Sequence, residues 1–341
     1  AQRGKLIGVA TRLLGLQKHW PMSLRNMWLM NVLFLILSLG GGFFTVSPFW
    51  TFVVLGAMFV FATISMFIWE KRTFCLYICP VSGFQGLYAN LSMCEVRRKD
   101  PEVCRAHIQK TCVTGNEHGY GCPWGLLPYR FQKNTYCGMC LECFKSCPYD
   151  NMAFNLRPPG VDLFLDKERG LDEAWKAFIM LGIALSFFLV FQGPYGFLKD
   201  WARARTPLGY LSFITLHTFT AAFLIPLMHL GFAYLSKVSS GNNGVSLKRV
   251  FVNFSYVLVP FGLAVWVAFS FGIFLPNGSY ILHVISDPFG LGWNLFGTAN
   301  FPWIPVLTPY LQPLKGITII GGLLFSMDTG YKIASQTYPT G

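Results

Sequence analysis

Uninterrupted apolar stretches alternate with polar segments along the chain, and they predict membrane-spanning helices. About 20 consecutive apolar residues are enough for a helix to cross the hydrocarbon core of a bilayer. The last stretch is the least apolar, because Gly321, Gly322, Asp328 and Gly330 interrupt it. We therefore expect an all-α polytopic membrane protein with about six transmembrane helices, at residues 27–44, 50–69, 175–191, 211–235, 250–275 and 317–333.

The polar segments divide the chain into four parts. Residues 1–26 are basic and can lie along the membrane surface, and residues 27–69 form a transmembrane hairpin. Residues 70–173 are a hydrophilic insert between the second and third helices. Residues 174–341 form a second transmembrane domain, and within it residues 276–315 are aromatic and poor in charge, which is typical of a loop or re-entrant hairpin at the interface.

The composition supports a membrane protein. Hydrophobic residues make up 53% of the 341 residues and charged residues only 12%, against about 25% in soluble domains. The net charge of +12 is scattered beside the predicted spans, so it reads as a topology signal and not as a nucleic-acid-binding surface. Basic flanks place the insert and both termini in the cytoplasm, although Lys199, Arg203 and Arg205 disagree with this orientation.

The insert ends in a cysteine motif that predicts an iron–sulfur cluster. The cysteines follow the spacing C-x2-C-x2-C-x3-C and Pro148 comes directly after the last, a run in which closely spaced thiolates ligate a [4Fe–4S] cube. Its members are Cys137, Cys140, Cys143 and Cys147. A structural zinc site would need four thiolates, but it does not explain the three-residue step before proline.

A second set of ligands is expected, since the fourth cysteine of such a run ligates the other cluster in two-cluster ferredoxins. We therefore assign the first cluster to Cys122, Cys137, Cys140 and Cys143. The second receives Cys104, His107, Cys112 and Cys147, with His107 standing two residues beyond Cys104. Imidazole ligates iron in some clusters and raises their potential. The alternative is that His107 is a surface residue and that Cys75, Cys79 or Cys94 completes the set.

Cys75 and Cys79 form a C-x3-C-P motif directly after the second predicted span. At helical spacing the two thiols share one face at the membrane surface. Two thiols cannot hold a cube alone. They could bind a haem or copper shared with a partner, form a redox disulfide, lend one ligand, or simply pack.

The motifs of residues 50–165 together resemble the membrane-bound polyferredoxins. The resemblance rests on Cys75-x3-Cys79-Pro80, on the segments 83–87, 98–100, 115–117 and 119–123, and on the final ferredoxin run. This family includes the quinol-oxidising membrane subunit of periplasmic nitrate reductase and the nitrous-oxide reductase regulator. The 26 residues before the first predicted span hold no flavin-binding domain like that of the regulator. A cysteine is expected in the family where His107 stands.

The resemblance implies a membrane electron carrier with two [4Fe–4S] clusters on the cytoplasmic face of a bacterial inner membrane. Such a carrier exchanges electrons between the quinone pool and partner redox subunits, and it is not an enzyme on its own. One alternative is an assembly or regulatory factor that supplies reducing equivalents for metallocentres. Another is a structural anchor of a redox complex.

Ionisable residues within predicted spans are candidates for function, because they are costly to bury in a membrane. His217 and His229 lie on the fourth span but twelve residues apart, so they do not share a face. One chain therefore lacks the facing histidines that a self-contained bis-histidine haem needs. His217, together with His283 and Asp287 of the aromatic loop, is a candidate quinone site that would accept protons from quinol.

Overall fold

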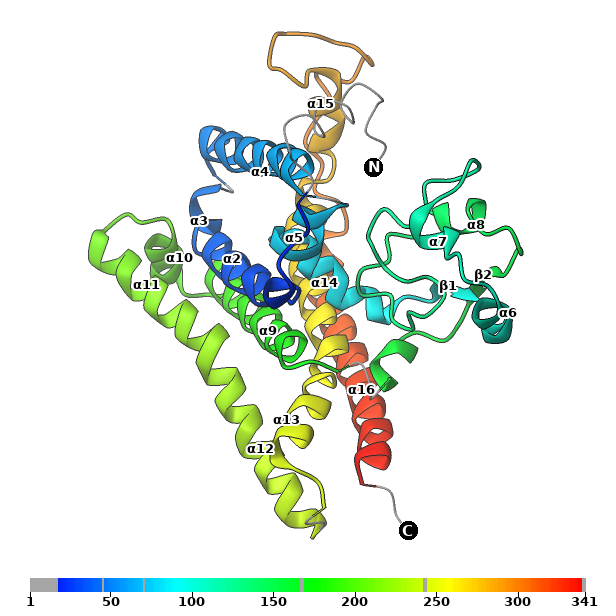
Figure 1. Cartoon of the computed structure of the whole chain (residues 1–341). Helices are drawn as coiled ribbons and strands as arrows, with labels where there is room; N and C mark the ends of the chain where they lie inside the picture. The colour runs from blue at the N-terminus through cyan, green and yellow to red at the C-terminus, as the bar shows by residue number, and fades with distance from the viewer. Residues whose placement is uncertain (1–17, 45, 70, 166–168, 242–243, 339–341) are drawn as a thin grey trace.

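The computed structural model describes residues 18–44, 46–69, 71–165, 169–241 and 244–338, and it is mostly helical. Figure 1 shows a group of long helices with a small domain to one side that carries both strands. Most of the predicted interfacial segment, residues 1–17, lies outside the described residues. In its remainder, Met22–Leu24 form a single helical turn.

Within the described residues, four helical stretches are long and apolar enough to cross a membrane. They confirm the predicted positions of spans two to five, with slightly different ends. They are Pro48–Ile68, Leu171–Gln192, Pro207–Ser240 and Leu247–Asn277.

The other two predicted spans take a different form. The first is a 12-residue helix, α2 (Trp28–Leu39), and a separate short helix α3 (Gly41–Phe44) follows the break at Gly40. The sixth is α16 (Leu311–Thr337), which is helical throughout but is not among the four apolar stretches. Six spans therefore remain a prediction, because α2 is short and α16 carries charged side chains.

Two of the long stretches are composite. Pro207–Ser240 consists of α11 (Pro207–Phe219) and α12 (Ile225–Ser240) joined by a π-helical turn. The turn precedes Pro226, which lacks the N–H that a regular helix would use there. Leu247–Asn277 consists of α13 (Leu247–Ser255) and α14 (Leu258–Asn277). The remaining helices of this part are α4 (Pro48–Ile68), α9 (Leu171–Gln192), α10 (Gly196–Ala202) and α15 (Tyr280–Ser286).

The main core lies where α9, α13, α14 and α16 meet α5 (Pro80–Tyr88). Phe178, Met180 and Ile333 are fully buried there. Small residues allow close helix contacts: a Cβ on Gly322 would lie 2.2 Å from that of Ala264, so α16 approaches α14 closely at this glycine. One of the glycines that make the sixth predicted span less apolar, Gly322, is therefore the site of this close helix contact.

Residues 276–315 were expected to be a loop or re-entrant hairpin. They contain the end of α14, the short helix α15, a helical turn at Thr308–Tyr310 and the start of α16, and the stretch between α15 and that turn has no regular structure. Many of their apolar side chains are exposed, including Phe289 and Phe296. An exposed apolar surface of this kind is typical of contact with lipid or with another subunit.

The cysteine domain branches from the helices through a two-stranded antiparallel neck, which the apolar pattern did not predict. Strand β1 (Cys94–Arg98) pairs with β2 (Met152–Leu156), with Cys94 opposite Leu156. Before β1, α5 ends at Tyr88 and the turn Ala89–Leu91 follows it. Between the strands lie only the short helices α6 (Pro101–Ala106), α7 (Thr111–Thr114) and α8 (Glu142–Lys145), and loops.

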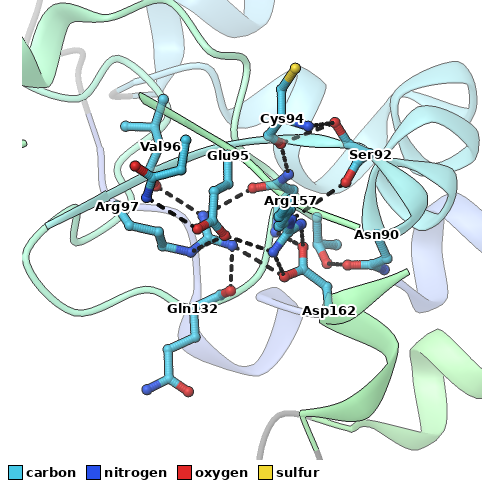
Figure 2. A network of polar contacts seen from close by, with 12 residues as sticks. Asn90, Ser92, Cys94, Glu95, Val96, Arg97, Gln132, Arg157 and Asp162 are labelled. Carbon is cyan, nitrogen blue, oxygen red and sulfur yellow. Dashed lines mark hydrogen bonds and ion pairs between the residues drawn. The ribbon is translucent and has the colours of Figure 1, made fainter. Parts of the chain in front are cut away.

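A buried carboxylate fastens this neck. Asp162, 1% exposed, accepts two hydrogen bonds from the Arg157 guanidinium, at 2.5 and 2.7 Å, and a third from Arg97 at 3.2 Å (Figure 2). A bidentate charge-assisted pair of this kind is strong and directional. Asp162 also accepts a bond from the backbone N–H of Asn134 at 2.8 Å. The exit of β2 is thereby joined to the loop that leads to Cys137.

Candidate iron–sulfur site

The four cysteines assigned to the first cluster line one pocket. Its wall is formed by Cys122, Cys137, Cys140 and Cys143, together with apolar side chains that include Val96 and Phe131. Cys140 is exposed, whereas Cys122 and Cys143 are buried. The thiols are therefore gathered beneath the domain surface with one member at the edge.

The backbone around Cys140 adopts an unusual conformation. Met139 and Leu141, on either side of it, have φ values of 45° and 58°, the left-handed region that non-glycine residues rarely adopt. Such positions cost free energy and cluster at functional sites. Backbone that alternates between right-handed and left-handed conformations forms concave arrangements of N–H groups, and such arrangements bind anions and iron–sulfur centres.

Burial makes these thiols resist ionisation. Burial, followed by the charges of neighbouring thiols, raises the pKa of Cys143 to about 12. Burial also raises the pKa of Cys122 and of Cys137, while backbone N–H groups of Trp124 and Met139 partly counteract it. Four clustered thiolates repel one another, so the set as a whole is suited to a cationic centre that compensates their charge.

Trp124 adds a polar group to the same pocket. Its indole Nε1 is buried and has no hydrogen-bond partner among the described residues. Unpaired buried donors are costly and rare. Gly138 leaves the room that this ring occupies, because a Cβ there would lie 2.4 Å from Nε1. The indole N–H can therefore donate to a sulfur atom of a cluster that the four thiols would hold.

A second group of thiols lies beside the first. Cys112 has its pKa raised mainly by burial, and then by the charges of Cys147 and Cys104. Cys112 and Cys143, from different groups, pack in one apolar cluster with Val96 and Met152. The two expected ligand sets therefore share a small core.

Asn151 contacts two thiols of the second group, and sequence reasoning did not identify it. Its side-chain amide donates to Cys104 Sγ at 3.2 Å, and its backbone N–H donates to Cys147 Sγ at 3.4 Å. The same amide donates to the Asp100 carbonyl at 2.7 Å, which fixes its orientation. Hydrogen bonds to cluster sulfurs are one of the means by which proteins set cluster potentials.

His107 directly follows α6, and its described contacts are with Val103, Lys110 and Tyr149. Its Nδ1–H donates to the Val103 carbonyl at 2.7 Å, and its ring lies 4.6 Å from that of Tyr149. A bond from one ring nitrogen to a carbonyl is the arrangement that orients metal-ligating histidines, with the other nitrogen as ligand. Ligation by His107 stays a prediction.

No group of three or more His, Cys, Asp or Glu side chains in the described part of the chain is arranged to hold a single metal ion. The thiols of the first group line one pocket. The first group offers four thiols as donors around this pocket, whereas the second offers three thiols and would need a further ligand to hold a cube.

Cys75 and Cys79 do not lie on a common α-helical face as expected. Phe74–Ile78 is a π-helical turn, and Cys79 is extended with φ −64° and ψ 117°. Pro80 explains this, since the residue before a proline avoids the helical region. The two thiols still interact: burial and then the charge of Cys79 raise the pKa of Cys75, while Arg72 lowers it.

The candidate quinone residues each have their own partners. His217 is 1% exposed and lies between two hydroxyls, with Ser38 Oγ 2.8 Å from Nε2 and Ser186 Oγ 2.7 Å from Nδ1. His283 is hydrogen-bonded to the Ala299 carbonyl. These contacts account for both histidines as packed polar residues.

Asp287 accepts hydrogen bonds from two backbone N–H groups of the loop that follows it, at 2.9 and 2.8 Å. Its backbone N–H donates to the His283 carbonyl at 3.2 Å, but among the described residues no side-chain contact joins it to His217 or His283. The common quinone site stays a prediction.

A buried ion pair connects the cysteine domain to the membrane helices. Glu173 in α9 is 7% exposed and lies 3.1 Å from Lys133 Nζ, and Tyr256 donates a short hydrogen bond to the same carboxylate oxygen. The other oxygen accepts from Asn90 at 3.1 Å and from Thr135 at 3.4 Å. The loop carrying Cys137 is thereby fixed to α9 and to Tyr256.

In comparison with known proteins, no family model, curated protein or solved structure matches the chain.

Proposed function

We propose that this chain is a membrane electron-transfer subunit that carries two [4Fe–4S] clusters. The observation that supports it most directly is the pocket lined by Cys122, Cys137, Cys140 and Cys143. When bound, each cluster would accept and release single electrons. Cys104, Cys112 and Cys147 would hold the second, with His107 as the proposed fourth ligand.

The chain's own residues supply the conditions that such a centre needs. The neck and the Asp162 network hold the ligand loops, and the apolar core around Val96 and Met152 excludes water. Trp124 and Asn151 present N–H groups to the sulfur atoms. The exposed Cys140 leaves one edge of the first group accessible, which suits electron exchange with a partner.

Large exposed apolar side chains surround the cysteine groups and support a partner surface. Ile108 is 96% exposed, and Tyr120, Leu141 and Tyr149 are also exposed. Exposed apolar patches mark interaction sites in folded domains. We infer that partner redox subunits approach here, and that quinone serves at the membrane, on the cytoplasmic face of a bacterial inner membrane.

Iron analysis tests the proposal. Anaerobically prepared protein should contain about eight iron atoms and eight acid-labile sulfides, the content of two cubes. Cys140→Ser should remove about half of the iron and leave the spectrum of the second cluster. Cys94→Ser is the matched control, since Cys94 belongs to the neck, and it should retain both clusters. Zinc in place of iron would contradict the proposal.

Co-purification separates the alternatives. An electron carrier should stay bound to other redox subunits in fixed ratio, whereas an assembly factor should associate transiently. In membranes, Cys143→Ala should stop cluster reduction by a quinol analogue without dissociating the complex. Normal electron flow through that variant would favour a structural anchor. Reporter fusions after Arg98 and Asn277 should give opposite answers, cytoplasmic for the first, if six spans are present.

A further inference from the structure

The segment between α14 and α16 has polar groups inside and apolar groups outside. We call residues 278–310 the α15 hairpin, and Figure 1 shows α15 and its loop at one end of the group of long helices. Ser286 is fully buried in this hairpin, whereas Phe289 and Phe296 are more than two-thirds exposed. A segment that folds in water buries its apolar side chains and exposes its serines. The α15 hairpin is therefore inverted.

Helix α15 shows the inversion directly. His283, Ser286 and Asp287 have the spacing i, i+3 and i+4, so they share one face. This face lies toward the loop, because Ser286 Oγ is 2.8 Å from Thr298 Oγ1 and His283 Nδ1 is hydrogen-bonded to the Ala299 carbonyl. The other side chains are apolar or aromatic and are exposed, namely Tyr280, Ile281, Leu282, Val284 and Ile285. A helix at a water-facing surface turns its apolar stripe inward, so α15 is built for apolar surroundings.

The polar groups of the hairpin bond to one another. Ser286 Oγ accepts hydrogen bonds from two backbone N–H groups of the returning loop, at 3.2 and 3.1 Å. Asp287 accepts two more, at 2.9 and 2.8 Å. The return to α16 is joined to the end of α14, since the Val306 N–H donates to the Leu275 carbonyl at 3.1 Å. Irregular backbone is tolerated at membrane depth where such partners satisfy it.

The hairpin begins at the boundary of the bilayer. The apolar stretch that ends at Asn277 is 31 residues long, more than the about 20 that cross the hydrocarbon core. Within the hairpin sequence, Asp287 is the one residue among Asp, Glu, Lys and Arg. Its tyrosines and tryptophans belong to the types that are enriched at membrane–water interfaces, and they are Tyr280, Trp293, Trp303 and Tyr310.

We propose that the α15 hairpin is embedded in the lipid interface, with its apolar side chains among the acyl chains. His283, Ser286 and Asp287 then form its polar interior. Lipid is favoured over another subunit because the exposed apolar side chains are not confined to one face. They lie on α15, at Phe289 and Phe296 of the loop, and on the return segment 303–307. A protein partner covers one patch of a surface, whereas lipid surrounds it.

Photo-crosslinking tests the proposal. p-Benzoylphenylalanine replaces Phe296 in the full chain, which is irradiated in native membranes so that any partner is present. Intact-mass measurement should show the chain with one added phospholipid. The matched control places the same group at Tyr120, an exposed aromatic residue of the cysteine domain, and should give no lipid adduct. A protein adduct at Phe296, or equal lipid adducts at both positions, would overturn the proposal.

Tryptophan quenching gives a second test that needs no unnatural residue. Trp303 is more than half exposed, so in vesicles of brominated phosphatidylcholine its fluorescence should be quenched strongly. The variant Trp303→Phe should therefore lose part of the lipid-quenched signal and keep the signal that acrylamide quenches from water. Loss of the acrylamide-quenched signal instead would place Trp303 in water and overturn the proposal. Neither test depends on iron, so failure here leaves the proposed electron transfer unaffected.

Discussion

The ion pair of Glu173 and Lys133 gives the sharpest test of how the cysteine domain is fixed to the membrane helices. Both residues are less than one-tenth exposed, and their charged atoms are 3.1 Å apart. Glu173→Gln keeps the shape of the side chain but removes the negative charge 3.1 Å from the buried Lys133 ammonium. Breaking a buried pair from one side costs about 3–5 kcal/mol. We expect the free energy of unfolding to fall by that amount.

A second variant separates the charge from the hydrogen bonds. Lys133→Met combined with Glu173→Gln removes both charges, while the new amide can still bond Asn90, Thr135 and Tyr256. Replacing both members of a buried pair is often neutral. The double variant should therefore recover most of the lost stability. Glu102→Gln is the surface control, since its pair with Arg105 is exposed and such pairs contribute about 0–1 kcal/mol.

Unfolding in mixed detergent micelles, followed by tryptophan fluorescence, measures these differences. Because Lys133 and Thr135 precede Cys137 closely, Glu173→Gln should also release iron from the first cluster before the second. The reasoning is refuted if Glu173→Gln costs no more than Glu102→Gln, or if the double variant is less stable than the single one.

Three further predictions concern the thiols and the helix contacts. Asn151→Leu removes a hydrogen bond to Cys104 Sγ. It should lower the reduction potential of the second cluster, because N–H donors stabilise the more negative reduced state. Redox titration measures this potential, with Asn155→Leu as the control. Burial raises the pKa of Cys143, so folded thiols hold protons more tightly than unfolded ones. The metal-free protein should therefore be most stable below the ordinary thiol pKa of about 8.5 and lose stability above it, whereas the cluster-loaded protein should not. Denaturation at pH 7 and pH 9.5 measures the loss of stability in both forms. A smaller loss in Cys143→Ser would identify Cys143 as the thiol responsible. Gly322→Val should lower the free energy of unfolding by about 1–3 kcal/mol through overpacking against Ala264, whereas Gly321→Val, with open space around it, should change it little. Equal losses of stability would exclude the close contact as the cause.

The apolar pattern predicted the long helices well, because about 20 apolar residues have few alternatives to a helix in a membrane. It gave no indication of the neck. Cys94–Arg98 and Met152–Leu156 pair across more than fifty residues, and their short, partly charged segments lack a clear alternation. Such pairing depends on contacts distant in sequence, notably the Arg97–Asp162 pair.

The four cysteines assigned to the first cluster line one pocket, and their ligation stays a prediction; the spacing did not predict what surrounds them. The left-handed Met139 and Leu141 carry no sequence signal, since neither is glycine. Asn151 follows the motif like any turn residue, and only the fold shows that it contacts two sulfurs. The spacing of Cys75 and Cys79 predicts a helical face, but Pro80 keeps Cys79 out of the helical region.

The two-stranded neck makes the cysteine domain an inserted module. Its ends leave the membrane helices as adjacent antiparallel strands, with Arg98 opposite Met152 at the far end. Domains whose ends lie close together can be inserted, removed or exchanged without rerouting the host chain. The segment between these residues could therefore change in length, ligand number or partner surface over evolution while the helices stay as they are. In engineering terms, a different redox module can be grafted onto the neck if its two ends are as close together as the ends of the two strands.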